Sequence, residues 1–470
     1  MHVDDGMATG LPVAEPRATP KPRGNEKKAT SATTMEAVCE RLTLALQKVA
    51  SNRGAPGPDG QTVDEVREHW STIMPALTTA LMTETYEPGN IRRVWIPKSD
   101  GSKRGLGIPD VIDRVVQEAV RQVLEPVYEP IFHDASHGFR SGRSCHTAIA
   151  AAREHVNEGY EWVVDIDLEK FFDKVNHQRL MARLAQRVTD RRLLVLIGRM
   201  LKAQVVMPDG VVVSTEEGVP QGGPLSPLLS NIVLSELDDE LAERGHRFVR
   251  YADDCNIYVR SERAGARVMA SVTDFIERRL RLKVNTDKSA VARPEERHFL
   301  GFRLEPGAHV GDTEVLLSKR SLKRIDEKIR ELTPRTWGRS LDDCIRAINV
   351  YLVGWLGFFG ICTRSVERTL HRLDAHIRRR LRAIQLTHWK SKRTIMRRLK
   401  QMGAKHRQAY KDVYGGRRSL WALSQAYSVD RVAMRNVYFT KRGLFSLLGT
   451  WTKRTKSRVA PGVQLRLPWG

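Results

Sequence analysis

The chain has 470 residues, which is enough for about two to four domains and a sizeable core. Its 78 lysines and arginines against 55 acidic residues give a formal net charge of +23. The excess is concentrated in residues 318–470, which hold 36 basic against 9 acidic side chains. Such a block repels itself unless a polyanion is near, so composition disfavours a merely solvated surface and indicates a nucleic-acid partner.

Cysteine usage and hydropathy point to a soluble cytoplasmic protein with no membrane partner. The five cysteines are odd in number and form no CxxC pair, which predicts reduced thiols and no zinc module. The N-terminus lacks the charged-then-apolar pattern of a signal peptide. The longest apolar run, 348–361, is shorter than the roughly 20 residues that a membrane-spanning helix needs.

The chain begins with a segment, 1–34, rich in proline, glycine, threonine, alanine and lysine, which predicts a disordered tail. Residues 35–50 then have apolar positions at helical spacing and predict an amphipathic helix. Its apolar stripe consists of Val38, Leu42, Leu46 and Val49. Glycines and prolines in 51–60 break the helix and predict a shaped loop.

Residues 91–109 predict a β-hairpin, because apolar and polar residues alternate up to a turn at 99–101 and a second strand follows. The basic side chains expected around its tip are Lys98, Lys103 and Arg104. A helix is predicted over 113–132, ending near Pro126 because proline interrupts helical hydrogen bonding.

Residues 160–184 predict a strand that leads into a helix. Period-two alternation puts Asp165 and Asp167 on one face of this strand. A small hairpin is predicted at 205–213. The next segment, 218–245, is a glycine-rich loop that runs into a helix, with Ser226 suited to cap its start.

Two further strands are predicted at Arg247–Tyr251 and Cys255–Arg260, with Ala252, Asp253 and Asp254 as the tight connection. Together these elements predict an α+β sheet with helices on one face. Beyond residue 318 the pattern becomes helical, and three amphipathic helices are expected to pack as a bundle with basic outer faces. The basic residues expected on those faces are Arg378, Arg379, Arg380 and Arg382.

The adjacent carboxylates Asp253 and Asp254 admit three interpretations. A solvated turn is the simplest, since aspartate is common in turns. General acid–base catalysis would need one raised pKa, but neighbouring turn residues usually point in different directions. A divalent-metal site needs a third carboxylate, and the strand at 160–168 supplies Asp165 or Asp167. The metal interpretation explains best how paired like charges are stabilised.

The sequence resembles the bacterial group II intron reverse transcriptases, or maturases. The resemblance rests on segments that occur in the family's order over about residues 45–305, and it is specific in combination. These segments are 52–60, 96–119, 136–146, 165–177, 218–232, 248–255, 282–289 and 298–302. A Gly-Trp with following aromatics, "GWLGFFG" at 354–360, resembles the hallmark of the family's thumb.

The resemblance implies roles for individual residues. Phe172 stands five positions after Asp167, as an aromatic follows the first metal-binding aspartate in the family, so Asp167 resembles that ligand and Asp165 a supporting group. With Asp253 and Asp254, and with the backbone carbonyl of Leu168, it would bind two Mg²⁺ ions, with Mn²⁺ as a possible substitute. The residues that resemble nucleotide contacts are Lys98, Arg104, Phe172, Gln221 and Lys288. Phe172 resembles the residue that excludes a ribose 2′-hydroxyl.

The implied fold is a right-hand polymerase, with fingers and palm of antiparallel sheet and helices, followed by an α-helical thumb or maturase domain. The implied divisions are a disordered tail (1–34), fingers with an N-terminal extension (35–130), palm and remaining fingers (131–312), thumb (313–400) and a basic DNA-binding-like segment without an endonuclease domain (401–470). In that last segment, basic residues interspersed with Trp421 and Trp451 suit nucleic-acid contact.

The resemblance implies an RNA-directed DNA polymerase that also binds its intron RNA and assists splicing and retrotransposition. Its partners would be the intron RNA in a ribonucleoprotein, an RNA template, a DNA primer or target, and dNTPs. It would be cytoplasmic, and nucleoid-associated on target DNA. Two alternatives stay open: a maturase that acts mainly as an RNA-binding splicing factor, and a free-standing or defence-associated reverse transcriptase.

Overall fold

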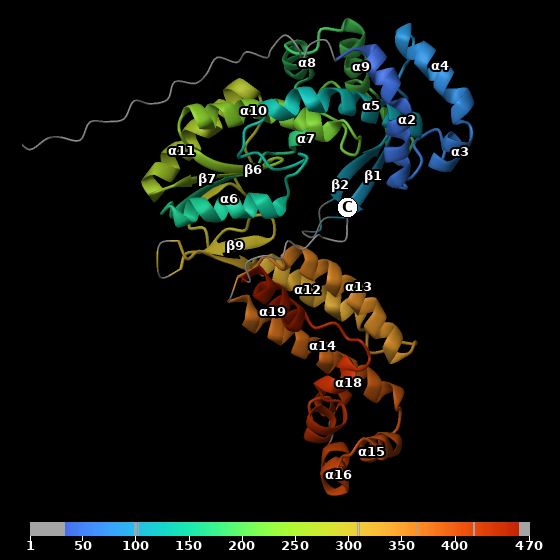
Figure 1. The fold of residues 1–470 in the computed structure, drawn as a ribbon, viewed down its shortest axis with the longest axis vertical. Helices are drawn as coiled ribbons and strands as arrows, with labels where there is room; N and C mark the ends of the chain where they lie inside the picture. Colours follow the sequence, from blue (N-terminus) through green and yellow to red (C-terminus); the bar gives the residue numbers. More distant parts are fainter. Residues whose placement is uncertain are drawn as a thin grey trace, which may run out of the picture. The chain divides into compact units, whose positions relative to one another are not determined.

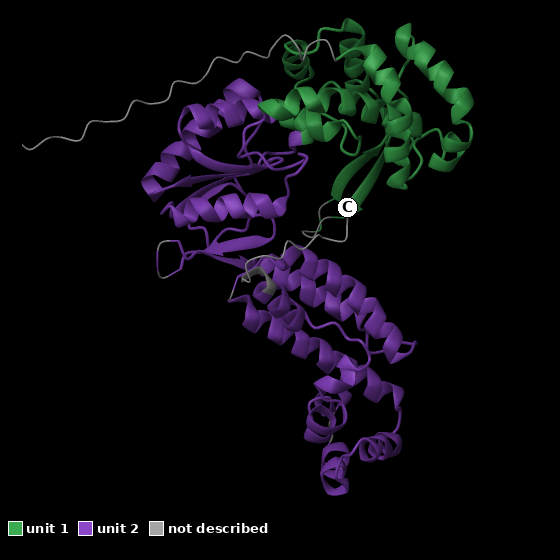
Figure 2. Ribbon diagram, in the orientation of Figure 1, with its two compact units in different colours: residues 1–131, 172–233 green, residues 132–171, 234–470 purple. Residues whose placement is uncertain are grey.

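The computed structural model describes residues 33–97, 101, 103–307, 309, 311–363, 365–416 and 419–459. The chain forms two compact units, one of residues 1–131 and 172–233 and the other of residues 132–171 and 234–470 (Figure 2). The predicted boundary at 130 lies next to a boundary between the units, whereas the predicted boundaries at 312 and 400 fall inside the second unit. Within the described residues, no helix is long and apolar enough to cross a membrane.

The first unit contains helices around a small four-stranded sheet (Figure 1). Its helices are α2 (Met35–Ser51), α3 (Val63–Glu68), α4 (Trp70–Met82), α5 (Val111–Tyr128), the 3-10 turn η2 (Glu129–Ile131), α8 (His177–Ala185) and α9 (Arg191–Leu201). Its strands are β1 (Ile91–Pro97), β2 (Lys103–Ile108), β4 (Val205–Val206) and β5 (Val212–Val213), in the order β2-β1-β4-β5. Two helices, α7 (Phe171–Lys174) and α10 (Ser226–Glu243), cross the boundaries between the units.

The predicted helices and hairpins of this unit are present, with small differences at their ends. The stripe of α2 is buried as predicted, and Thr34, assigned to the tail, accepts a hydrogen bond from Ala37 N as the helix cap. Residues 1–32 of that tail lie outside the described part of the chain. Helix α5 continues through Pro126 to Tyr128, because a proline near a helix end removes only one late hydrogen bond. Ser226 is the first residue of α10, and its hydroxyl donates to Pro220 O instead of capping the helix.

The loop predicted at 51–60 is tied to the rest of the unit through backbone carbonyls. Arg114 Nη2 donates to Ala55 O at 2.8 Å, and Arg92 Nη2 donates to Pro56 O at 2.6 Å. The prolines and glycines of the loop therefore allow a backbone conformation in which its carbonyl groups reach the arginines of α5 and β1.

The second unit is built on a four-stranded antiparallel sheet in the order β6-β7-β3-β8. The strands are β3 (Trp162–Ile166), β6 (Arg247–Tyr251), β7 (Asp254–Val259) and β8 (Ala290–Ala292), and a separate antiparallel pair is β9 (Phe302–Glu305) and β10 (Glu314–Leu317). Helix α6 (Cys145–Asn157) packs on one face, with Val163 and Tyr258, and α11 (Glu262–Phe275) packs on the other, where Gly265 lies against Val164 (Figure 1). The prediction of helices on one face was therefore wrong.

Helices make up the rest of the second unit. They are the π-turn η3 (Ile276–Leu280), α12 (Lys319–Leu332), α13 (Leu341–Phe359), α14 (Val366–His388), α15 (Lys392–Gln401), α16 (His406–Tyr414), α17 (Leu420–Leu423), the π-turn η4 (Ser428–Ala433), α18 (Asn436–Thr440) and α19 (Leu447–Val459). The three predicted amphipathic helices correspond to α12, α13 and α14, and their apolar stripes are buried or half-buried.

One hydrophobic core joins the sheet to these helices and continues past residue 400. It runs from Val163 in β3 through Leu352 in α13 to Phe439 and Trp451. Trp451 is 3% exposed and its indole N–H donates to Cys362 O at 3.1 Å. Trp451 is thus a core residue, and its predicted role in nucleic-acid contact was wrong. The segment after residue 400 shares its core with the helices before it.

Candidate active site

The turn between β6 and β7 carries Asp253 and is held by close backbone packing. Tyr251 pairs with Asp254 across the hairpin, and Ala252 has φ +57°. This left-handed conformation costs a residue with a side chain about 1–2 kcal/mol, so surrounding contacts must maintain it. A Cβ atom added to Gly138 would lie 2.3 Å from Ala252 N, so only glycine lets that segment pack against the turn.

A fully buried ion pair supports the same turn. Arg250 and Asp238 of α10 are both 0% exposed, and Arg250 Nη2 lies 2.5 Å from Asp238 Oδ2. Arg250 also donates to Ala252 O at 2.9 Å and to Ser136 Oγ at 2.8 Å. The arginine thereby links α10 and the 133–138 segment to the turn. Sequence reasoning did not find this pair, although an aspartate on the apolar stripe of a helix was a signal for a buried partner.

Asp167 follows β3 and is positioned by the segment 284–289. Asp167 N donates to Ser289 Oγ at 3.0 Å, and Asp167 O accepts from Asn285 N at 2.8 Å. Leu168 pairs with Val284 in an isolated bridge. Lys288 Nζ lies 3.5 Å from Asp167 Oδ2. The structure thus brings together two predicted site residues, Asp167 and Lys288, that are far apart in the sequence.

Asp165 has a different partner from Asp167. Arg297 donates to Asp165 Oδ2 from both Nε, at 2.9 Å, and Nη2, at 2.5 Å, and it also donates to Lys288 O. Burial raises the pKa of the Asp165 carboxyl, and Arg297 opposes this rise. The charge of Asp165 is therefore balanced within the protein, as suits a supporting group.

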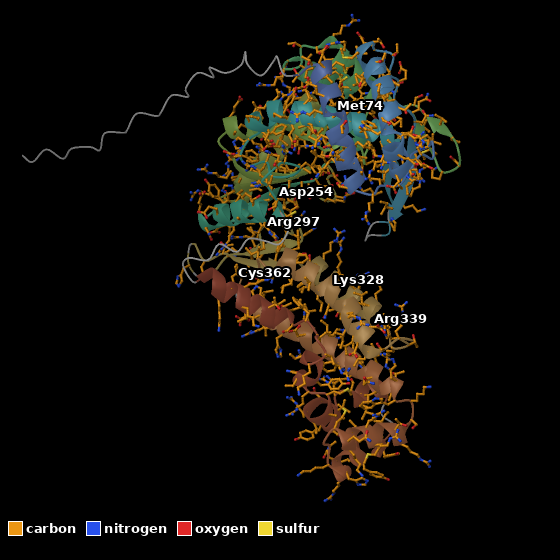
Figure 3. All side chains as sticks on the ribbon, turned by 45° about the vertical axis from the view of Figure 1, so that its right-hand side comes forward. Met74, Asp254, Arg297, Lys328, Arg339 and Cys362 are labelled. Carbon is orange, nitrogen blue, oxygen red and sulfur yellow. The ribbon has the colours of Figure 1, made fainter. Side chains whose placement is uncertain are left out.

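Asp254 lies in strongly repulsive surroundings. Burial raises the pKa of its carboxyl to about 7, and the charges of Asp253, Asp167 and Asp165 act in the same direction against a smaller effect of Lys288. Asp254 and Arg297 are both labelled in Figure 3. The site therefore collects more negative charge than its own cations balance, a condition that a bound cation would relieve.

The donor chemistry of this site fits a hard divalent cation. The side chains are carboxylates, which are the ligands that Mg²⁺ and Mn²⁺ prefer. Within the described ranges, no group of three or more histidine, cysteine, aspartate or glutamate side chains is arranged to hold a metal ion as it stands. The fit thus rests on charge and ligand type, and Mg²⁺ sites normally complete their shell with water and substrate phosphates.

Two predicted nucleotide contacts meet in the first unit. Arg104 Nε donates to Gln221 Oε1 at 2.8 Å, and Gly107 N of β2 donates to Gln221 O at 2.6 Å. Gly222 has φ +125°, and a Cβ added there would lie 2.3 Å from Gly107 O. The glycine at position 222 therefore allows a close approach of this loop to strand β2. Lys98 lies outside the described residues.

Phe172 is buried, with 7% of its surface exposed, and its neighbour Phe171 is 2% exposed. Phe172 O accepts a hydrogen bond from Val219 N at 2.6 Å, so the loop that carries Gln221 is also bonded to α7. The contact of Phe172 with a deoxyribose stays a prediction.

The arginines of α14 are not the uniform outer face that was predicted. Arg382 is 4% exposed and lies 2.5 Å from Asp430 Oδ1, and its Nε donates to Met434 O. Arg380 donates to Thr333 O at 2.7 Å. Arg379 is stacked 3.9 Å from the ring centroid of Trp421. Arg378 lines a surface cleft and is half-buried. The placement of Arg380 and Arg382 on a free RNA-facing surface was wrong. Residues after 400 cover Arg382, whereas Arg380 is bonded to the C-terminal end of α12 through Thr333 and Arg330.

Comparison with known proteins gives the family. Residues 96–304 match the family described as reverse transcriptase (RNA-dependent DNA polymerase), and residues 322–403 match the group II intron maturase-specific domain. Protein YkfC of Escherichia coli (strain K12) is 33% identical over 306 residues, which cover 56% of this chain and 80% of YkfC. Group II intron-encoded protein LtrA of Lactococcus lactis subsp. cremoris is 39% identical over 210 residues, 44% of this chain and 34% of LtrA. Retron Mx162 reverse transcriptase of Myxococcus xanthus is 32% identical over 217 residues, 42% of this chain and 43% of that protein.

The fold and the two matched domains define a reverse transcriptase with a maturase domain. The chain belongs to the family of group II intron reverse transcriptases and maturases. The match spans about a third of the length of LtrA, and four fifths of YkfC.

Proposed function

We propose that this protein extends a DNA primer on an RNA template, using two Mg²⁺ ions held by Asp167, Asp253, Asp254 and the carbonyl of Leu168. The observation that supports this best is the unbalanced negative charge around Asp254, to which Asp253 and Asp167 contribute. When bound, the two Mg²⁺ ions would align the primer 3′-hydroxyl with the α-phosphate and neutralise the charge of the pyrophosphate leaving group, and Mn²⁺ could replace them.

The remaining site residues bind and orient the nucleotide in this proposal. Arg104, held by Gln221, contacts the triphosphate together with Lys98, and Gln221 faces the incoming nucleotide. Phe172 excludes the 2′-hydroxyl of a ribonucleotide by its bulk. Lys288, whose ammonium group lies 3.5 Å from Asp167 Oδ2, turns to the phosphates when a nucleotide binds. A flexible lysine with 59% of its side chain exposed can make this exchange at small cost.

The proposed biological partner is a group II intron RNA, which the protein binds to form a ribonucleoprotein and helps to splice. The matched maturase-specific domain supports this partner, as does the basic composition after residue 318. In this role the protein works in the cytoplasm, and on nucleoid DNA when the intron moves to a target.

Primer extension by an Asp253→Asn variant tests the polymerase proposal. Loss of one carboxylate charge should lower the extension rate about 1,000-fold or more, because several kcal/mol of transition-state stabilisation depend on the metals. RNA affinity should stay the same. The matched control is Asp274→Asn, which changes an exposed carboxylate on α11 that pairs with Arg278. Near-normal cDNA synthesis by Asp253→Asn would refute the assignment.

A further inference from the structure

A second concentration of unbalanced charge lies on α15 and α16, which form a helical hairpin at the end of the second unit away from β6 and β7 (Figure 1). The helices border an open surface cleft of about 440 Å³. Its lining residues are Arg393, Met396, Arg397, Lys400, Gln401, His406 and Tyr414. This volume falls within the range of about 300–1,000 Å³ that is usual for sites binding small molecules or single residues of a polymer.

The arginines and the lysine that line this cleft differ from Arg382 of α14, which is paired with Asp430. Within the described ranges, no ion pair or side-chain hydrogen bond involves Arg393, Arg397 or Lys400, and no acidic side chain lines the cleft. The three side chains are exposed and recur at helical spacing on one face of α15. The three cations therefore create a positive electrostatic potential at the solvent-exposed opening of the cleft, and this potential attracts phosphate groups.

An aromatic ladder on α16 lies beside the same cleft: His406 and Tyr414 are among the lining residues, and Tyr410 lies between them on the helix, outside that lining. His406, Tyr410 and Tyr414 recur every four residues, so their rings lie on one face of the helix. The ring centroids of Tyr410 and Tyr414 are 4.9 Å apart, and those of His406 and Tyr410 are 6.2 Å apart with an interplanar angle of 26°. Tyr410 is 56% exposed, and Lys392 Nζ lies 5.6 Å from the Tyr414 ring centroid.

The frame of this hairpin is rigid, although its lining is exposed. Ile395, Met396 and Leu399 of α15 are buried in the hydrophobic core, and so are Ala409 and Val413 of α16. Buried Asp412 accepts hydrogen bonds from Gln408 Nε2 at 3.1 Å and from Ser428 N at 3.0 Å. The aromatic rings and cations are therefore presented by a fixed backbone, which lowers the entropy cost of binding a ligand.

We propose that this cleft binds an unstacked nucleotide of single-stranded nucleic acid, with the base on the Tyr410–Tyr414 face and the flanking phosphates on Arg393, Arg397 and Lys400. An acidic peptide could pair with the cations but would make no stacking contact with the tyrosine rings. A nucleic acid makes both contacts, because every base has a face that stacks on an aromatic ring. Contacts of this kind carry no base specificity, and the strand can be RNA or DNA. The inference goes beyond polymerisation and does not depend on it.

Crosslinking of the full-length protein to a single-stranded oligonucleotide carrying 5-iodouracil tests the site. Irradiation of parallel RNA and DNA oligonucleotides should give a crosslink to Tyr410 or Tyr414, mapped by mass spectrometry. The DNA and RNA arms identify which strand is preferred. The same crosslink should form in Asp253→Asn protein, so a failure of the polymerase proposal would leave this result unaffected. Crosslinks only to residues outside α15 and α16 would overturn the inference.

Affinity measurements provide the second readout. Tyr410→Ala should weaken binding of the single strand about 5- to 100-fold, the effect of losing one stacking partner. Tyr410→Phe should restore it, because the ring is retained. Because Tyr410 is exposed, neither change should disturb folding. The charge-matched control for Arg393→Gln/Arg397→Gln is Arg407→Gln/Lys411→Gln, on α16 outside the cleft lining. Equal losses in the two pairs, equal losses for duplex and single strand, or full competition by polyglutamate would each refute a nucleotide site.

Discussion

The sheet around β6 and β7 and the helices after residue 318 both carry many charged side chains. In each region, some of these charges are paired within the protein and others are not. In the sheet, Asp165 is balanced by Arg297, whereas burial, together with the like charges of neighbouring aspartates, raises the pKa of Asp254 to about 7. In the helices, Arg382 is balanced by Asp430 whereas Arg393 and Arg397 face solvent. Each region thus contains charges that hold the fold together and charges that the fold leaves unbalanced. Unbalanced charge marks the surfaces where an external partner is expected.

After the loss of catalysis in Asp253→Asn, the largest effect is expected when Arg382, a charge that is paired within the protein, is removed. Arg382→Gln removes a guanidinium that is buried between Asp430 and Met434 O, and it leaves Asp430 with the longer, 3.7 Å contact to exposed Arg431. The melting temperature should fall by about 5–10 °C, since breaking a buried pair costs about 3–5 kcal/mol. The control is Arg372→Gln, exposed on the same helix, which should change the melting temperature by less than about 1 °C. If Arg382→Gln weakened RNA binding without any loss of stability, the residue would belong to the binding surface.

A smaller effect is expected for the choice of sugar. Phe172→Val opens space where the proposal places the 2′-hydroxyl, so the ratio of ribonucleotide to deoxyribonucleotide incorporation should rise about 10- to 100-fold. The ratio is measured on one template with matched NTP and dNTP. Phe171→Val is the control, because that ring is also buried but carries no proposed contact. An equal ratio in wild type and Phe172→Val would make Phe172 a core residue only.

The smallest effect concerns pH and stability. The folded carboxyl of Asp254 has a pKa of about 7, above the value of about 4 for an unfolded chain, so the folded state holds this proton more tightly. In buffer without divalent ions, the free energy of unfolding should therefore fall as pH rises from about 4 to about 7. Asp254→Asn removes a buried negative charge that the neighbouring aspartates repel. The change should raise the melting temperature at pH 8 by about 1–3 °C, with little change at pH 4. A lower melting temperature of Asp254→Asn at pH 8 would contradict the repulsive site.

Periodicity was sufficient for the elements around the candidate site and for the first helices after residue 318. Alternation predicted β3 and the hairpin of β6 and β7, and helical spacing predicted α2, α12, α13 and α14. Sequence did not predict the arrangement of helices on both faces of the sheet, because amphipathic patterns do not say which faces meet. For the same reason Arg380 and Arg382 of α14 looked free, because their partners lie more than 40 residues away in the chain, before α14 for Arg380 and after it for Arg382.

The candidate site was partly predictable. Motif order located Asp167, Asp253 and Asp254, and structure added the residues that hold them. The buried pair Arg250–Asp238 and the Ser289 contact of Asp167 depend on tertiary packing between distant segments. The cleft between α15 and α16 was hidden in a region known only to be basic, because charge counts do not distinguish paired from unpaired arginines.

We propose that the carboxylates around Asp254 carry the chemistry and that solvent-exposed cations of the helices carry nucleic-acid affinity. Asp253→Asn and Arg393→Gln/Arg397→Gln should be compared by primer extension on a saturating short primer-template and by RNA affinity over a range of salt. Asp253→Asn should lose extension with unchanged affinity. The arginine variant should keep extension and lose about 0.7–0.9 in the slope of log K against log salt for each phosphate contact removed. Collapsed extension with an unchanged salt slope in the arginine variant would contradict the division.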